Sequence, residues 1–266
     1  MDAYAILWSD LMMLKRRWPK YLLTTLISPL LYLVAFGWGL GQGISISGTS
    51  YLEFVVPGII ALTAMTASFN GAGARLNTDR IYFRSFDECL MAPISSLSLL
   101  LGKASIGVVQ GLVSSITFLA VALLIVPEFH VSTLFLVILV ITCFTFSFLG
   151  VLVALLANTH EDMATFSSLI LLPMTFLGGT FFSVSQVPTA LKIALYALPL
   201  THSSMCLRAA VLGQPVPWGS ILATACFMMM FSIGSMIVFE RNQLAKSYSI
   251  FPNLGGIVGR MVLQVV

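Results

Sequence analysis

Seven of the 23 charged residues of this chain lie in one short segment, residues 75–103, which reads RLNTDRIYFRSFDECLMAPISSLSLLLGK. Its charged members are Arg75, Asp79, Arg80, Arg84, Asp87, Glu88 and Lys103. Long stretches on both sides hold no charge, and hydrocarbon does not accept so dense a set of charges. We therefore expect this segment, termed the polar island, to lie in water beside a membrane, where it can meet a soluble partner.

The composition agrees with a membrane setting. The chain is 58% hydrophobic and only 9% charged, whereas a soluble domain carries about 25% charged residues. So little charge cannot coat a water-facing surface. The sequence predicts an all-α polytopic membrane protein.

Six apolar runs are long enough to cross about 30 Å of hydrocarbon. They are residues 21–42, 54–74, 104–126, 131–157, 163–182 and 218–239. Glycines and prolines break the region 183–215, which we expect to form short re-entrant helices that dip into the outer leaflet and return. We expect residues 1–250 to form one transmembrane domain and leave the tail, 251–266, unassigned.

The N-terminal segment has the pattern of a surface helix. Apolar residues from Tyr4 to Trp18 recur at spacings of three and four, and Asp10, Lys15, Arg16 and Arg17 supply a polar, mostly basic side. This pattern predicts an interface helix over residues 1–20 that lies along the membrane. The alternative is an ordinary solvent-exposed lead-in.

Small residues four apart occur in two of the runs. Gly107 and Gly111 form one such pair, and Gly37 and Gly41 form another, which predicts close helix approach. For the second pair, a frayed helix end explains the glycines equally well.

Orientation follows from Lys and Arg, which are enriched on the cytoplasmic side. Four lie in the N-terminal segment, four in the polar island and three after the last run, whereas only Lys192 and Arg208 fall on the other side. We expect both termini and the polar island to be cytoplasmic.

The runs lack the chemistry of an enzyme. They hold no Asp, Glu, Lys, Arg or His before their ends, and no HExxH or paired-carboxylate motif occurs. The four cysteines show no ligand spacing, so neither catalytic nor metal-binding residues are expected. His160, Glu161 and Asp162 fit a turn that caps a helix.

The sequence also lacks an ATP-binding loop of the Walker A type. Its one Gly-Lys pair, Gly102-Lys103, is followed by Ala104, and Leu97 stands where the first glycine is needed. Active transport by this chain would therefore need energy from another polypeptide.

Four segments in this order resemble those of ABC-2 type permeases, above all the bacterial nodulation-export and daunorubicin-export kind. They are YLEFVVPGII (51–60), DECLMAPISSLSLLLGK (87–103), FLGGTFFSVSQVP (176–188) and LPLTHSSMCLR (198–208). The likeness covers residues 3–241.

The resemblance implies an inner-membrane half-transporter. Two copies of the chain would pair with two ATP-binding cassette subunits, with ATP and Mg bound to those subunits and no cofactor in this chain. Nucleic acid is not an expected partner; membrane lipid is. The coupling helix would span residues 84–92, and its contacts with the ATPase would come from Arg84, Phe86, Asp87, Glu88 and Leu90.

The resemblance also implies an export path along the first, second and fifth runs. Its candidate lining residues are Phe36, Trp38, Phe69, Thr175 and Phe181. The outer re-entrant helices map to residues 187–212, with Pro188, Pro199, His202 and Arg208 as candidate gate residues.

The function expected from these features is that of a permease in an ATP-driven exporter. Apolar runs suit a lipid, a lipo-oligosaccharide or a drug-like molecule better than a free ion. An ion-coupled carrier, which would work without ATP, and a non-transporting membrane scaffold are the alternatives.

Overall fold

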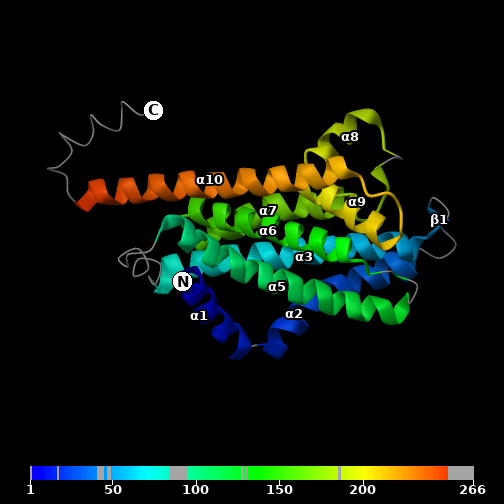
Figure 1. The fold of residues 1–266 in the computed structure, drawn as a ribbon, viewed down its shortest axis with the longest axis horizontal. Helices are drawn as coiled ribbons and strands as arrows, with labels where there is room; N and C mark the ends of the chain where they lie inside the picture. Colours follow the sequence, from blue (N-terminus) through cyan, green and yellow to red (C-terminus); the bar gives the residue numbers. More distant parts are fainter. Residues whose placement is uncertain are drawn as a thin grey trace.

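The computed structural model describes residues 2–16, 18–40, 45–46, 49–83, 95–126, 129, 131–184 and 187–250, and this part of the chain is nearly all helical (Figure 1). The helices are α1 (Asp2–Arg16), α2 (Trp18–Tyr32), η1 (Leu33–Leu40), α3 (Tyr51–Thr78), η2 (Asp79–Phe83), α5 (Ser96–Ile125), α6 (Thr133–Leu156), α7 (His160–Leu177), α8 (Thr189–Tyr196), α9 (Pro199–Val211) and α10 (Trp218–Ile250). Both η segments are π-helical and continue the helix before them. A short antiparallel pair of strands, β1 (Ser45–Ile46) and β2 (Thr49–Ser50), comes between η1 and α3.

The long helices α3, α5, α6, α7 and α10 run side by side, and α1 crosses them at an angle near the N-terminus (Figure 1). We call the end of the bundle that holds Arg75 and Lys103 the charged end, and the end near β1 and α8 the opposite end. Helix α3 is central and packs on both α5 and α6. In its most apolar stretch 83% of the residues are buried, against 17% for α2 and for α10.

Within the described residues, five segments are long and apolar enough to cross a membrane, which confirms the predicted class. They are Trp18–Gly37, Tyr51–Tyr82, Ser96–Ile125, Thr133–Leu156 and Trp218–Gln243. Helix α7 is not among them, because Glu161 and Asp162 in its first turn lower its mean hydropathy. The count of six crossings therefore stays a prediction.

The core of α3, α5 and α6 depends on small residues. A Cβ atom added at Gly107 would lie 2.6 Å from the Ser68 carbonyl oxygen, and one at Gly73 would lie 2.7 Å from the Gly150 oxygen. Backbones this close leave no room for a side chain. The predicted packing role of the pair Gly107 and Gly111 is confirmed, because a Cβ at Gly111 would overlap the Ser68 hydroxyl.

The polar island is more helical and more buried than predicted. Helix α3 with η2 runs on to Phe83, and α5 begins at Ser96 rather than at residue 104. Asp79 and Lys103 are only 5% and 6% exposed. The expectation that all charges of the island face water is wrong for these two, because they pair with other charges, as described below.

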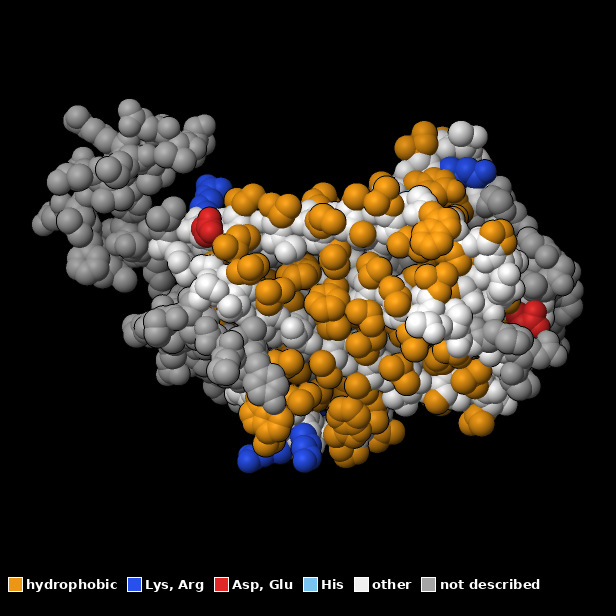
Figure 2. Space-filling view, viewed as in Figure 1, with side chains coloured by type: hydrophobic (Ala, Val, Ile, Leu, Met, Phe, Trp, Pro, Cys, Tyr) orange, Lys and Arg blue, Asp and Glu red, His pale blue; other side chains and the backbone are white. Residues whose placement is uncertain are grey.

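Hydrophobic side chains cover the middle of the face in Figure 2, and Lys, Arg, Asp and Glu appear only near its margins. Such a band is what a bilayer requires.

Helix α7 starts at a capping box in which Thr159 and Asp162 bond each other's backbone amides, so the predicted capping turn is confirmed.

Candidate functional site: a charge cluster and a polar cleft

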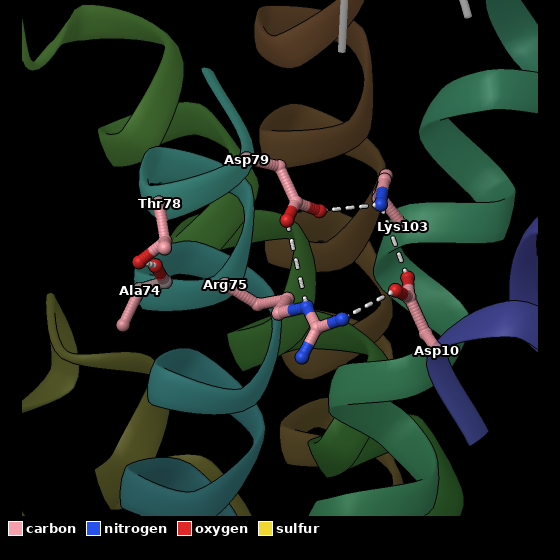
Figure 3. Close-up of polar contacts among 6 residues, drawn as sticks. All are labelled: Asp10, Ala74, Arg75, Thr78, Asp79 and Lys103. Atoms are coloured by element: carbon pink, nitrogen blue, oxygen red, sulfur yellow. Dashed lines mark hydrogen bonds and ion pairs between the residues drawn. The ribbon is translucent and has the colours of Figure 1, made fainter. Parts of the chain in front are cut away.

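Four charged side chains meet at the charged end, and we call Asp10, Arg75, Asp79 and Lys103 the charge cluster (Figure 3). Lys103 Nζ lies 2.7 Å from Asp79 Oδ2 and 3.1 Å from Asp10 Oδ2. Arg75 Nη2 lies 3.1 Å from Asp10 Oδ1, and its Nε lies 3.7 Å from Asp79 Oδ1. Two cations and two carboxylates balance, which a buried site demands because an unpaired charge there is costly.

The charge cluster joins three parts of the chain. Asp10 comes from α1, Arg75 and Asp79 from the end of α3 and from η2, and Lys103 from α5. Asp10 was predicted on the polar, outward side of α1, yet it is 4% exposed. Helix α1 therefore packs on α5 with Asp10 and Leu14 buried, while Lys15 and Arg16 stay exposed.

Residues of η2 hold two further helices. The guanidinium of Arg80 donates hydrogen bonds to the carbonyl oxygens of Ala154 and Ala157 at the end of α6. A cation suits these carbonyls, which lack helical partners and form the negative end of the helix dipole. The ring of Tyr82 stacks on His160 at the start of α7, with 4.8 Å between centroids.

A cleft of about 390 Å³ lies between α2, α3, α5 and α7. Ten of its fifteen lining residues are polar and none is charged. The polar ones are Tyr21, Thr24, Thr25, Ser28, Tyr32, Thr63, Thr66, Asn70, Gln110 and Thr175. Tyr21 also ties α2 to α5, because its hydroxyl donates to the Gln110 carbonyl and lies 3.0 Å from Ser114 Oγ.

A second, smaller cleft of about 220 Å³ continues the first toward the charge cluster. The two share Tyr21, Thr24 and Gln110, and the smaller one adds Asp10, Lys20 and Arg75 to its wall. The polar cleft is thus bordered at its charged end by two members of the charge cluster.

Aromatic rings lie beyond the cleft toward the opposite end. Phe36 stacks on Phe181 with 4.1 Å between centroids, and Tyr32 of the cleft wall lies 5.6 Å from Phe181. Among the residues predicted to line a path, Thr175 lies in the cleft and Phe36 and Phe181 lie beside it. Phe69 is fully buried in the core instead, and the side chain of Trp38 lies outside the described residues.

Four consecutive carbonyls after α7 are held by side chains from elsewhere. Gly178 accepts from Ser204 Oγ at 2.9 Å, Gly179 and Thr180 accept from Arg208 Nη2 at 3.0 and 3.4 Å, and Phe181 accepts from Tyr51 Oη at 2.9 Å. Gly179 has a φ of 66°, a left-handed conformation that favours glycine. Non-helical backbone at membrane depth needs such partners.

Arg208 is the largest contributor to this support. It is 8% exposed, donates a third bond to the Phe54 carbonyl at 3.0 Å, and lies 3.6 Å above the Phe54 ring. Of the other predicted gate residues, Pro188 precedes α8 and Pro199 opens α9. His202 Nε2 lies 2.9 Å from the Tyr196 carbonyl oxygen, which joins α8 to α9.

The structure does not test the predicted coupling contacts. Arg84, Phe86, Asp87, Glu88 and Leu90 lie outside the described residues, as does Arg17 of the interface helix. The charge cluster, which joins α1 to the ends of α3 and α5, was missed by sequence reasoning. So was the cleft, although Thr63, Thr66 and Asn70 recur at helical spacing on an otherwise apolar helix, a pattern that indicates a functional face.

Comparison with known proteins now decides the family. The family model described as ABC-2 type transporter matches residues 2–212. This chain belongs to the ABC-2 type transporter family. An ABC-2 permease is the membrane subunit of a transporter and not a catalytic subunit.

Named relatives of this ABC-2 chain agree. It is 29% identical over 200 residues to the inner membrane transport permease YadH of Escherichia coli, covering 74% of this chain and 78% of that protein. It is 28% identical over 232 residues to nodulation protein J of Neorhizobium galegae, covering 86% and 88%. The chain is therefore a multi-pass membrane protein of the permease type.

Proposed function

We propose that this chain is the permease of an ATP-driven exporter that carries an amphipathic or hydrophobic molecule out of the cytoplasm or inner leaflet. Two copies would work with two ATP-binding cassette subunits, which bind ATP and Mg. The charged end would face the cytoplasm, with both termini on that side. Helix α7 would bring the number of crossings to six, as the fifth in chain order, and α8 and α9 would be the outer re-entrant pair.

The observation that carries this proposal is the charge cluster. It joins the surface helix α1 to the ends of the two helices that flank residues 84–94. In ABC-2 transporters the coupling segment that receives the ATPase is expected there. A displacement of that segment would reach α1, α3 and α5 together, because breaking a buried ion pair costs about 3–5 kcal/mol. The helices would then reorient as fairly rigid bodies.

The polar cleft is an argument that the chain pairs with a second copy of itself. Thr24, Ser28 and Asn70 are exposed although they lie within segments that can cross a membrane. An amide facing hydrocarbon without a partner costs several kcal/mol, at about 4–8 on the cyclohexane scale. We infer that this face turns toward a second copy or toward a watery path between copies.

The coupling role can be tested by reversing the charges of Asp87 and Glu88 to Lys. We expect assembly with the cassette subunit to weaken at least about tenfold, since removing charges at an interface typically costs 2–5 kcal/mol. Export and export-linked ATPase activity should fall with it. Co-purification and ATPase assays in proteoliposomes would measure both effects.

The exposed Glu240, on α10 at the same end, provides a matched control. Glu240→Lys should leave assembly and export unchanged. Full assembly and export in the Asp87 and Glu88 variant would refute the coupling role. Flux that follows an ion gradient without ATP would favour a carrier, and no substrate-stimulated ATPase activity with any cassette partner would favour a scaffold.

A further inference from the structure

The polar cleft has a chemical bias that follows from where its hydroxyl protons point. Thr63 Oγ1 donates to the Ile59 carbonyl at 2.7 Å, Thr66 to the Leu62 carbonyl at 3.0 Å, and Thr175 to the Leu171 carbonyl at 2.7 Å. A hydroxyl has one proton and two lone pairs. When the proton bonds to the helix backbone, the group can offer a ligand only acceptor sites.

The same holds on the facing helix. Thr24 Oγ1 donates to the Lys20 and Tyr21 carbonyls at 3.0 Å, and Thr25 donates to the Tyr21 carbonyl at 2.9 Å. Thr63 is fully buried, so four of these five threonines, on three helices, can present lone pairs to a ligand. The amides of Asn70 and Gln110 and the hydroxyls of Ser28 and Tyr32 add both kinds of group. Acceptors are in excess, so the cleft suits a ligand that donates hydrogen bonds.

The charges around the cleft further narrow the class of ligand that it can bind. None of the described residues that line the 390 Å³ cleft is charged, so an ammonium group would lose its hydration without a counter-ion. The adjoining cleft holds Lys20 and Arg75 against one carboxylate, Asp10, which Arg75 and Lys103 already engage. This mouth does not attract cations. A phosphate or carboxylate would in turn meet the lone pairs of the threonines.

The remaining walls suit an apolar chain. Phe36 and Phe181 stack beyond Tyr32, and Leu172 in the cleft wall is 57% exposed. A volume of about 390 Å³ is within the usual range of small-molecule sites. Hydrogen-bond acceptors and apolar surface thus adjoin in one groove.

We propose that the cleft binds the uncharged, hydroxyl-rich head group of an amphiphile, such as a glycolipid, and rejects anionic and cationic head groups. That this ligand is also the exported substrate rests on the proposed function. Binding itself does not, so the two can fail separately.

The experiment uses the full chain in lipid nanodiscs and three radiolabelled probes of equal chain length. These are dodecyl maltoside, dodecyl phosphate and dodecyl trimethylammonium. We expect the maltoside to bind at least about tenfold more tightly than either charged probe, as a few well-placed hydrogen bonds would produce. Equal or tighter binding of a charged probe would overturn the proposal, and this comparison needs no variant.

A triple variant, Thr24→Val, Thr66→Val and Thr175→Val, removes three acceptors and preserves the side-chain shape. Maltoside affinity should fall about tenfold or more, while the charged probes should change little. Thr142→Val is the matched control, because Thr142 Oγ1 donates to its own helix in the same way at 2.8 Å but lies in α6, away from the cleft. Wild-type affinity in the triple variant would overturn the proposal.

Selective maltoside binding without coupling to any cassette ATPase would refute the proposed function and leave this inference unaffected. ATP-coupled export together with equal affinity of the cleft for all three probes would support the proposed function and refute this inference.

Discussion

Lys103 is the residue on which the charge cluster depends, because its ammonium group contacts both carboxylates (Figure 3). It is 6% exposed, so its hydration has been replaced by those two contacts. From sequence, Lys103 is merely the end of a polar segment and part of an incomplete Walker pattern. Its role follows from Asp10, which lies 93 positions away.

Substitution Lys103→Met should lower the free energy of unfolding by about 3–5 kcal/mol, because it leaves two buried carboxylates facing one guanidinium. Unfolding by SDS titration in mixed micelles would measure this. Lys15→Met on the exposed side of α1 is the control and should change stability by less than about 0.5 kcal/mol. Equal effects of the two substitutions would contradict the buried ion pairing.

At the scale of elements, the contact between α3 and α6 is a contact of backbones. A Cβ at Gly150 would overlap the Phe69 carbonyl. Gly234 on α10 provides the contrast, since a Cβ there would meet only Leu152 at 3.5 Å, an ordinary contact. Both glycines are helical, so the difference between them is packing alone.

The substitutions Gly150→Ala and Gly234→Ala should therefore have opposite signs. Overpacking at Gly150 should cost about 1–3 kcal/mol, whereas Gly234→Ala should gain up to about 1 kcal/mol from helix propensity. The same SDS titration would compare them. Stabilisation by both would show that α3 and α6 do not approach as closely as described.

For the whole molecule, the prediction concerns which face meets a second copy. The polar cleft opens on one face through Thr24, Ser28 and Asn70, whereas α10 exposes apolar residues such as Ile233, which is 60% exposed. Lipid can cover the apolar face of α10 without burying an unsatisfied polar group, but it cannot do so for the face with the polar cleft.

In a chain with Cys89 and Cys226 replaced by Ser, Ser28→Cys should cross-link two copies in native membranes on mild oxidation. Ile233→Cys, at a similarly exposed helical position, should not. The measurement is the dimer fraction on a non-reducing gel. Cross-linking through residue 233 alone would place the partner on the opposite face and contradict the proposed pairing.

The amino-acid sequence alone sufficed to assign the membrane class, the region 187–212 in which the short helices α8 and α9 lie, and the family. These follow from local properties: the absence of charge over about twenty residues, the spacing of prolines and glycines, and short motifs. Only the tertiary structure decided that Asp10 is buried, that Lys103 lies between two carboxylates, and that Phe69 belongs to the core rather than to the cleft. Hydropathy along the chain reports whether a segment can leave water, but a charge can be buried when residues distant in sequence neutralise it. The charge cluster and the polar cleft are built from such distant partners, so they come into view only when the helices are packed together.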